Sequence, residues 1–169
     1  MPNIIGLDLS LTSTGYVTLD EFGEVVNNGA IKSKQKGIER LIELRDGVTE
    51  LVPFAHQELV DLIVIEGYAF GAQNQAAYIG ELGGVVKVAL HELGREMLIV
   101  PPAKVKQFAT GKGNARKDMM RLEVFKRWGF EAKTDDEIDA YALARIGYAL
   151  MYKDDTLTQA QRDVIEKLR

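Results

Sequence analysis

The sequence predicts an α/β fold in which helices cover a sheet. Three short apolar runs rich in Val, Ile and Thr open the chain, and helical and strand-like segments alternate after them. The turn sequence Asp20-Glu21-Phe22-Gly23 separates the second and third runs and is typical of an antiparallel hairpin. The segment 61–66 is apolar without interruption from Leu62 to Ile65, which indicates a strand buried on both faces. We therefore expect antiparallel strands early in the chain and a strand in the middle of the sheet.

The elements can be placed from periodicity and end signals. Strands are expected at residues 3–9, 14–20, 24–31, 61–66 and 97–100. A first helix is expected from Ser33, a candidate N-cap, to Pro53, with Ile38, Leu41, Ile42 and Val48 on one apolar face. Further helices are expected from about 73 to Gly94, from Pro102 to Phe108, from 115 to Gly129, and from Thr134 onward. A short last helix at about 157–169 would begin with the capping-box pair Thr158 and Gln161. No linker, repeat or low-complexity segment divides residues 1–169, so one domain is expected.

Composition restricts the chemistry of any functional site. The 169 residues are 46% hydrophobic and 27% charged, as expected for one globular domain with a substantial core. No apolar run is as long as a membrane span, and no secretion signal precedes the first strand, so we expect a cytoplasmic protein. Cysteine is absent, and the two histidines, His56 and His91, lack metal-ligand spacing. Any metal would be bound by carboxylates, which favours hard ions such as Mg²⁺ or Mn²⁺.

Carboxylates occur at the ends of three predicted elements. Asp8 lies in the first strand, just before a Ser/Thr/Gly turn, and Glu66 ends the strand 61–66. Asp136 and Asp139 are three residues apart at the start of the helix after Thr134, so they share one face. A buried unpaired carboxylate costs several kcal/mol, and gathered carboxylates repel unless a cation neutralises them. Two Mg²⁺ ions about 4 Å apart would suit such a cluster, and a pair of this kind serves phosphodiester hydrolysis.

Each of these carboxylates also has a purely structural interpretation. Asp8 could accept hydrogen bonds from Ser10, Thr12 or the turn backbone. Acidic residues in the first helical turn, here Asp135, Asp136 and Glu137, stabilise a helix through its dipole. Asp139 fits this interpretation less well, because the small apolar residues that follow it indicate a helix face packed on a sheet.

The segment from Lys104 to Arg127 is strongly basic although the chain as a whole is acidic. It contains eight basic and two acidic residues, whereas the net charge of the whole chain is −4. Such segregation is expected when one face of a protein binds a polyanion and another carries a carboxylate cluster. The alternative is a solvated basic helix without a binding role.

The helix at about 73–93 contains three glycines, Gly80, Gly83 and Gly84. Glycine inside a helix costs up to about 1 kcal/mol relative to alanine. Close approach of another backbone would explain them, and that backbone could be the sheet beneath or a partner helix in a dimer.

Four pieces of the chain, taken in order, resemble the RuvC family of Holliday-junction resolvases in the RNase H-like nuclease superfamily. The pieces are Gly6-Leu7-Asp8-Leu9-Ser10 with Thr14-Gly15; Ile65-Glu66 followed by Tyr68 and Phe70; Val105-Lys106-Gln107 leading to residues 110–117; and Asp136-Glu137-Ile138-Asp139-Ala140. The first piece alone also fits actin-like ATPases, whereas all four in this order are specific. The resemblance covers Ile4 to about Leu150, and the compact size without cysteine would suit a phage-encoded member.

The resemblance implies an RNase H-like fold, with a mixed five-stranded sheet whose first three strands are antiparallel and whose faces are covered by helices. It implies a homodimer whose two sites cut symmetric strands of a four-way DNA junction. Asp8, Glu66, Asp136 and Asp139 would hold two Mg²⁺ ions, for which Mn²⁺ would substitute, and Lys117 would stabilise transition-state charge. The residues implied in DNA binding are Lys104, Lys106, Lys112, Arg116, Lys117, Tyr68 and Phe70. The two aromatic residues would stack on unpaired bases, unless they only pack within the protein.

Other functions fit parts of the same sequence. An actin-like kinase would need a second domain of comparable size, and the chain is too short for one. A non-catalytic junction-binding protein would keep the basic segment but would not need all four carboxylates. A nuclease acting on RNA:DNA hybrids or on branched DNA in general would use the same site, and it remains the alternative.

Overall fold

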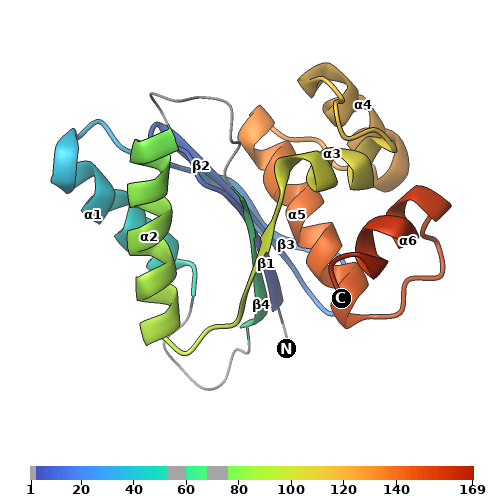
Figure 1. Cartoon of the computed structure of the whole chain (residues 1–169), viewed down its shortest axis with the longest axis horizontal. Coiled ribbons are helices and arrows are strands. Elements are labelled where there is room, and N and C mark those ends of the chain that lie inside the picture. The colour runs from blue at the N-terminus through green and yellow to red at the C-terminus, as the bar shows by residue number, and fades with distance from the viewer. Residues whose placement is uncertain (1–2, 53–59, 68–75) are drawn as a thin grey trace.

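The computed structural model describes residues 3–52, 60–67 and 76–169 and shows a sheet with helices on both faces (Figure 1). The strands are β1 Asn3–Asp8, β2 Ser13–Leu19, β3 Val25–Lys32, β4 Val60–Glu66 and β5 Met97–Val100. The helices are α1 Gly37–Glu50, α2 Ala76–Glu92, α3 Pro102–Thr110, α4 Lys117–Trp128, α5 Asp135–Met151 and α6 Gln159–Glu166. The strands and helices expected from the sequence are thus present, with ends shifted by a few residues.

The five strands form a mixed sheet in the order β3-β2-β1-β4-β5. β1 pairs antiparallel with β2 and parallel with β4, β2 pairs antiparallel with β3, and β4 pairs parallel with β5. The predicted mixed sheet with three antiparallel strands at its beginning is confirmed. β4 is an interior strand, and Ile63, Val64 and Ile65 are buried on both of its faces, as its continuous apolar sequence indicated.

Two hydrophobic layers enclose the sheet. On one face, α1 and α2 cover Ile5 and Leu7 of β1. On the other face, α5 covers Ile4, with α3, α4 and α6 packed around it (Figure 1). Because successive side chains of a strand point to opposite faces, Ile4, Gly6 and Asp8 share the α5 face of β1. The same alternation puts Val64 and Glu66 of β4 on that face.

Helix α5 lies unusually close to the sheet because two strand residues opposite it are glycines. A Cβ atom at Gly6 would lie 2.0 Å from the carbonyl oxygen of Ala140 and 2.5 Å from the amide nitrogen of Ala144. A Cβ atom at Gly15 would lie 2.3 Å from the carbonyl oxygen of Asp136. Any larger residue at either position would push the helix away. The beginning of α5 is therefore held directly over β1 and β2.

The predicted start of α1 at Ser33 is wrong. The helix begins at Gly37, after Lys36, whose side chain makes no capping hydrogen bond with the described residues. β3 continues to Lys32, so Ser33 follows the strand directly and lies too early to cap the helix. Its hydroxyl instead bonds to the carboxylate of Glu43 and accepts the backbone N–H of Gln35.

The apolar face predicted for α1 is also partly wrong. Leu41, Leu44 and Val48 are buried against the sheet, whereas Ile38 is 62% exposed and Ile42 is 43% exposed. The buried residues follow a spacing of three and four, which defines a narrow stripe. Ile38 and Ile42 lie outside this stripe and contribute apolar surface that faces solvent.

The ends of the last two helices follow the sequence closely. Thr134 caps α5 and Thr158 caps α6, each in a complete capping box with the residue three positions later, Glu137 or Gln161. α6 is shorter than the predicted segment 157–169. Within the residues that the structure describes, no helix is long and apolar enough to cross a bilayer.

Candidate active site

Asp8 and Glu66 leave the sheet side by side. Asp8 is the last residue of β1 and Glu66 is the last residue of β4. The two strands are parallel, and Leu7 pairs with Ile65 in their register, so the next residue of each strand lies at the same edge. Both side chains point to the α5 face, and a hydrogen bond links their carboxyl groups.

Helix α5 brings two further carboxylates to this edge. The backbone of Asp136 lies against Gly15, which is the register partner of Asp8 on β2. Asp139 is three residues further along and precedes Ala140, whose carbonyl lies against Gly6. Asp136 and Asp139 both act electrostatically on Asp8, and Asp139 acts on Glu66. The four predicted carboxylates thus gather at one edge of the sheet.

Burial and mutual repulsion change the acidity of three of these groups. Burial, together with the charges of Glu66, Asp139 and Asp136, raises the pKa of Asp8 well above its ordinary value. Burial and the charge of Asp139 raise the pKa of Glu66 to about 7. For Asp139, burial is again the main cause, and its pKa is raised to about 6 although Lys117 opposes the shift. The protein alone therefore holds this cluster at an electrostatic cost.

A divalent cation fits the chemistry of this cluster. Carboxylate oxygens are the ligands that Mg²⁺ and Mn²⁺ prefer, and a cation would stabilise the charged carboxylates against both their burial and their mutual repulsion. Among the residues described, no three acidic or histidine side chains already stand as a finished metal cage. The four carboxylates interact electrostatically without forming such a cage.

Two lysines lie close enough to influence the carboxylates. Lys117, the first residue of α4, lowers the pKa values of Asp8, Glu66 and Asp139. Lys106 on α3 lowers the pKa values of Glu66 and Asp139. The basic segment therefore reaches the acidic cluster at these two positions.

The other predicted DNA-binding residues lie on the neighbouring surface. Lys104 is half-buried on α3 and bonds to the side-chain oxygen of Gln107 at 3.4 Å. Lys112 is exposed in the connection between α3 and α4. Arg116 is exposed at the N-cap of α4, and its Nε lies 3.3 Å from the carboxylate of Asp118. Tyr68 and Phe70 fall outside the residues that the structure describes.

The other basic residues of the segment lie in surface ion pairs. Arg121 pairs with Asp135 at 2.8 Å, and Lys126 and Arg127 both face Glu123, at 3.4 and 3.8 Å. Pairing with Arg121 also places Asp135 in a surface ion pair. Four of the eight basic residues counted in the sequence, Arg116 among them, therefore lie in ion pairs with acidic residues.

Two residues near the site were not predicted from the sequence. Glu137 is buried, and its carboxylate accepts hydrogen bonds from Thr134 and from Asn28 of β3. The spacing of Thr134 and Glu137 is the sequence signal of a capping box, which could have indicated the first of these contacts. Nothing in the sequence indicates the pairing with Asn28, 109 residues away.

The sheet order β3-β2-β1-β4-β5, with its first three strands antiparallel and helices on both faces, is that of an RNase H-like fold. The family model for the crossover junction endodeoxyribonuclease RuvC matches residues 4–146, which include all four carboxylates. The chain therefore belongs to the RuvC family.

Individual relatives match the chain over most of its length. RuvC of Dictyoglomus thermophilum is 32% identical over 161 residues, which cover 90% of this chain and 98% of the relative. RuvC of Synechococcus sp. (strain WH7803) is 28% identical over 153 residues, which cover 86% of this chain and 97% of the relative. Among solved structures, T. thermophilus RuvC in complex with Holliday junction substrate superimposes with a TM-score of 0.71 at 26% identity, covering 85% of this chain and 91% of that one.

The raised pKa values predict how pH and metal affect stability. Between about pH 4 and pH 7 the folded protein holds more protons on Glu66 and Asp139 than the unfolded chain does, so these groups lower the free energy of unfolding as pH rises. Asp8→Asn removes one of the repelling charges, so it should increase the free energy of unfolding at pH 8. Each kcal/mol of that increase should raise the melting temperature by about 2–4 °C. Mg²⁺ should stabilise the wild type more at pH 8 than at pH 5.5, because protons compete with the metal.

Thermal unfolding followed by circular dichroism measures both effects. Glu39→Gln, which changes an exposed carboxylate on α1, is the control and should leave the pH profile unchanged. A Mg²⁺ shift that is equal at both pH values, or a lower melting temperature for Asp8→Asn at pH 8, would contradict the electrostatic description of the cluster.

Proposed function

We propose that this protein is a structure-selective endodeoxyribonuclease that resolves four-way DNA junctions by metal-dependent phosphodiester hydrolysis. The observation that carries the proposal is the buried group of carboxylates from β1, β4 and α5, flanked by Lys106 and Lys117. Such a group suits the hydrolysis of a phosphodiester, because it can bind divalent cations beside a polyanion. Membership of the RuvC family and the likeness to a RuvC in complex with Holliday junction substrate favour branched DNA over other substrates.

The proposed cofactor is a pair of Mg²⁺ ions, with Mn²⁺ as a substitute. Asp8, Glu66, Asp136 and Asp139 would hold them, and a bound metal of this kind supplies a more acidic water and a positive charge beside the phosphate. The protein contributes the fixed arrangement of the carboxylates and a partly buried environment in which charges interact strongly. Lys117 lies where it would stabilise negative charge that develops on the phosphate.

The proposed DNA surface surrounds this edge of the sheet. Its basic residues are Lys104, Lys106, Lys112, Arg116 and Lys117, on α3, the following connection and the start of α4. The DNA would contact the half of the segment nearer the carboxylates, because Lys106 and Lys117 act electrostatically on them. We also propose that Tyr68 or Phe70 stacks on an unpaired base at the crossover.

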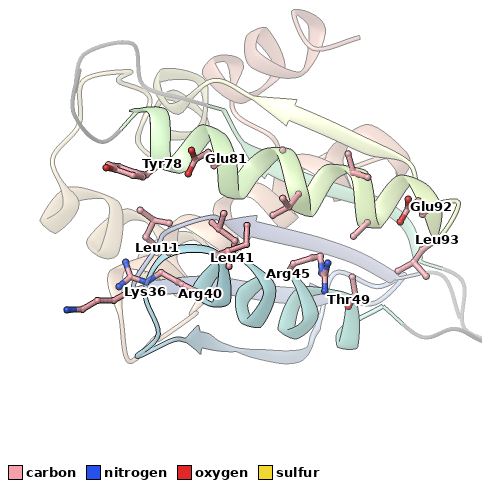
Figure 2. A pocket seen from close by; sticks show the side chains of 16 residues that line it. Leu11, Lys36, Arg40, Leu41, Arg45, Thr49, Tyr78, Glu81, Glu92 and Leu93 are labelled. Atoms are coloured by element: carbon pink, nitrogen blue, oxygen red, sulfur yellow. The ribbon is translucent and has the colours of Figure 1, made fainter.

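We infer that the protein acts as a homodimer through a groove between α1 and α2. The groove has a volume of about 1330 Å³ and is lined mainly by apolar groups, among them the exposed side chains of Tyr78 and Val88 (Figure 2). Apart from their own helix, Gly80 and Gly84 have no described atom within 4 Å of where a Cβ would be, so the sheet does not explain them. A second α2 helix packing across the groove would use this space.

The charges of the groove suit a second copy in a two-fold arrangement. Lys36 and Arg40 lie with Glu81 near Tyr78 at one end of the groove, and Arg45 and Glu92 lie toward the other end (Figure 2). In an isologous dimer with antiparallel α2 helices, Lys36 of one protomer would face Glu92 of its partner. Two active sites would then be available for the two strands of a junction that must be cut.

The first test concerns the carboxylates. Asp8→Asn and Glu66→Gln should each reduce cleavage of a labelled four-way junction at least about a hundredfold, since even residues that only support metal ligands cost 10–100-fold. Junction binding should persist or tighten, because a negative charge near the phosphate is removed. Gel-based single-turnover cleavage in Mg²⁺ measures the rate, and Ca²⁺ should support binding without efficient cutting. Substantial turnover by either variant would refute the metal site.

The substrate class is tested in the same assay. Four-way junction, linear duplex and RNA:DNA hybrid of equal length are compared with the wild type in Mg²⁺. We expect the junction to be cut fastest, at symmetric positions. Faster cleavage of the hybrid or the duplex would favour the alternative nuclease, and binding without any cleavage would favour a non-catalytic junction-binding protein.

The second test concerns the basic surface. Neutralising Lys112, Arg116 or Lys117 should reduce the slope of log affinity against log salt by about 0.9 for each phosphate that the protein no longer neutralises. Lys112→Ala and Arg116→Ala should weaken binding at a similar cleavage rate, whereas Lys117→Ala should also slow cleavage of fully bound junction. Lys126→Ala is the control, because Lys126 lies in the last turn of α4, at the opposite end of the helix from Lys117. Equal slopes for all four variants and the wild type would exclude a DNA contact at these positions.

The third test concerns the dimer. Lys36→Glu or Glu92→Lys should place like charges opposite each other and shift the mass measured by light scattering from dimer toward monomer. The double variant Lys36→Glu/Glu92→Lys should restore the dimer, and Gly84→Leu should disrupt it by filling the groove. A wild type that is monomeric at micromolar concentration, or a double variant no better than the single ones, would exclude this interface.

The proposed location follows from the substrate. Branched DNA lies in the cytoplasm of a bacterium, or of a bacterial host for a phage-encoded protein, so we propose that the protein acts there.

A further inference from the structure

Glu137 is a buried carboxylate whose two oxygens have separate partners. Only 3% of the residue is exposed. Its Oε2 accepts hydrogen bonds from the backbone N–H and the hydroxyl of Thr134, both at 2.9 Å. Its Oε1 accepts a hydrogen bond from the side-chain amide of Asn28, also at 2.9 Å. Leaving either oxygen without a donor at this depth would cost free energy, so both sets of contacts hold the side chain in place.

The contact with Asn28 ties the start of α5 to the edge of the sheet. Asn28 lies on β3, where it pairs with Val17 of β2. Val17 belongs to the hydrophobic layer beneath α5, so Asn28 faces the helix from the outer strand. The first turn of α5 is therefore fixed on one side by Asn28 and pressed against β2 at Gly15.

The position of Glu137 in the helix turns this link into a constraint on the active site. Successive residues of a helix are about 100° apart around its axis, and residues three apart are nearly aligned. Asp136 and Asp139 therefore share the face toward Asp8, while Glu137 points to β3. Holding Glu137 fixes how the first turn is rotated, and this rotation decides where the carboxylate of Asp136 lies.

The capping box of α6 shows what a cap alone requires. There Gln161 accepts from the backbone N–H and hydroxyl of Thr158 through one oxygen, and its Nε2 has no hydrogen-bond partner among the described residues. A single side-chain oxygen thus suffices to cap a helix of this protein. The second oxygen of Glu137 and its contact with Asn28 go beyond capping.

We propose that Asn28 and Glu137 are positioning residues, which set the first turn of α5 so that Asp136 is in place to bind a divalent cation. This inference rests on the metal site of the proposed function. It adds two residues that are not metal ligands and that lie on the opposite side of the turn from the carboxylates.

An exchange of the two groups tests the link. Asn28→Asp alone places two carboxylates in contact and should weaken Mn²⁺ binding about tenfold, the usual cost of losing support for a metal ligand. In the double variant Asn28→Asp/Glu137→Gln, the amide nitrogen at position 137 can donate to the carboxylate at position 28. The amide oxygen at position 137 still accepts from Thr134, so the affinity for Mn²⁺ should return to near the wild-type value. Glu137→Gln alone should have a small effect, because Asn28 can rotate its amide and accept instead.

Isothermal titration calorimetry with Mn²⁺, on the protein without DNA, measures these affinities independently of cleavage. Asn28→Ala serves as a milder variant, and it should weaken binding several-fold if the exchange variant proves hard to fold. Thr158→Ala is the matched control, because it removes a capping box far from the carboxylates and should leave Mn²⁺ affinity unchanged. All variants are compared at a temperature at which circular dichroism shows them folded.

Two results would overturn the inference. Wild-type Mn²⁺ affinity in both Asn28→Asp and Asn28→Ala would show that the link does not position Asp136, as would failure of the exchange variant to recover. Asp8→Asn distinguishes failure of this inference from failure of the proposed function. If Asp8→Asn binds Mn²⁺ as tightly as the wild type does, the proposed metal site is wrong, and the inference fails with it.

Discussion

The close contact between α5 and the sheet is the constraint that determines the site. Backbone atoms of Ala140 and Ala144 occupy the space that a side chain on Gly6 would fill, and Asp136 lies in the same way against Gly15. Since Asp8 follows Gly6 on the same face of β1, a helix held this close carries its own carboxylates to Asp8 and Glu66. Packing and function are thus linked through two glycines that have no chemistry of their own.

The electrostatics of the cluster explain how the charges are distributed along the chain. Burial first and mutual repulsion second raise the pKa values of Glu66 and Asp139 to about 7 and about 6. Lys106 and Lys117 reduce this cost without removing it. Cations bound beside a DNA phosphate would complete the neutralisation, and the same arrangement lets an acidic protein present a basic surface where DNA would bind.

Much of the fold and of the site could be predicted from local sequence. The carboxylates of β1 and β4 stand out because they end apolar runs, and Asp136 and Asp139 follow a helix start signal. Other features depend on contacts between distant segments, which a local pattern does not encode. The pairing of Asn28 with Glu137 joins β3 to α5, and the pairing of Arg121 with Asp135 joins α4 to α5. Ser33 is a misleading start signal for α1 because the extent of β3 is set by pairing with β2.

Carboxylates from three separate segments should form one metal site, and cleavage of the protein by bound iron would reveal whether they do. Fe²⁺ is expected to bind oxygen-rich sites of this kind. With ascorbate and peroxide it generates radicals that cut the nearby backbone. We expect cuts near Asp8, Glu66 and Asp136–Asp139 in the same preparation, all suppressed by excess Mg²⁺ or Mn²⁺. Cuts confined to one of these segments, or located instead along the acidic surface of α1, would contradict a shared metal site.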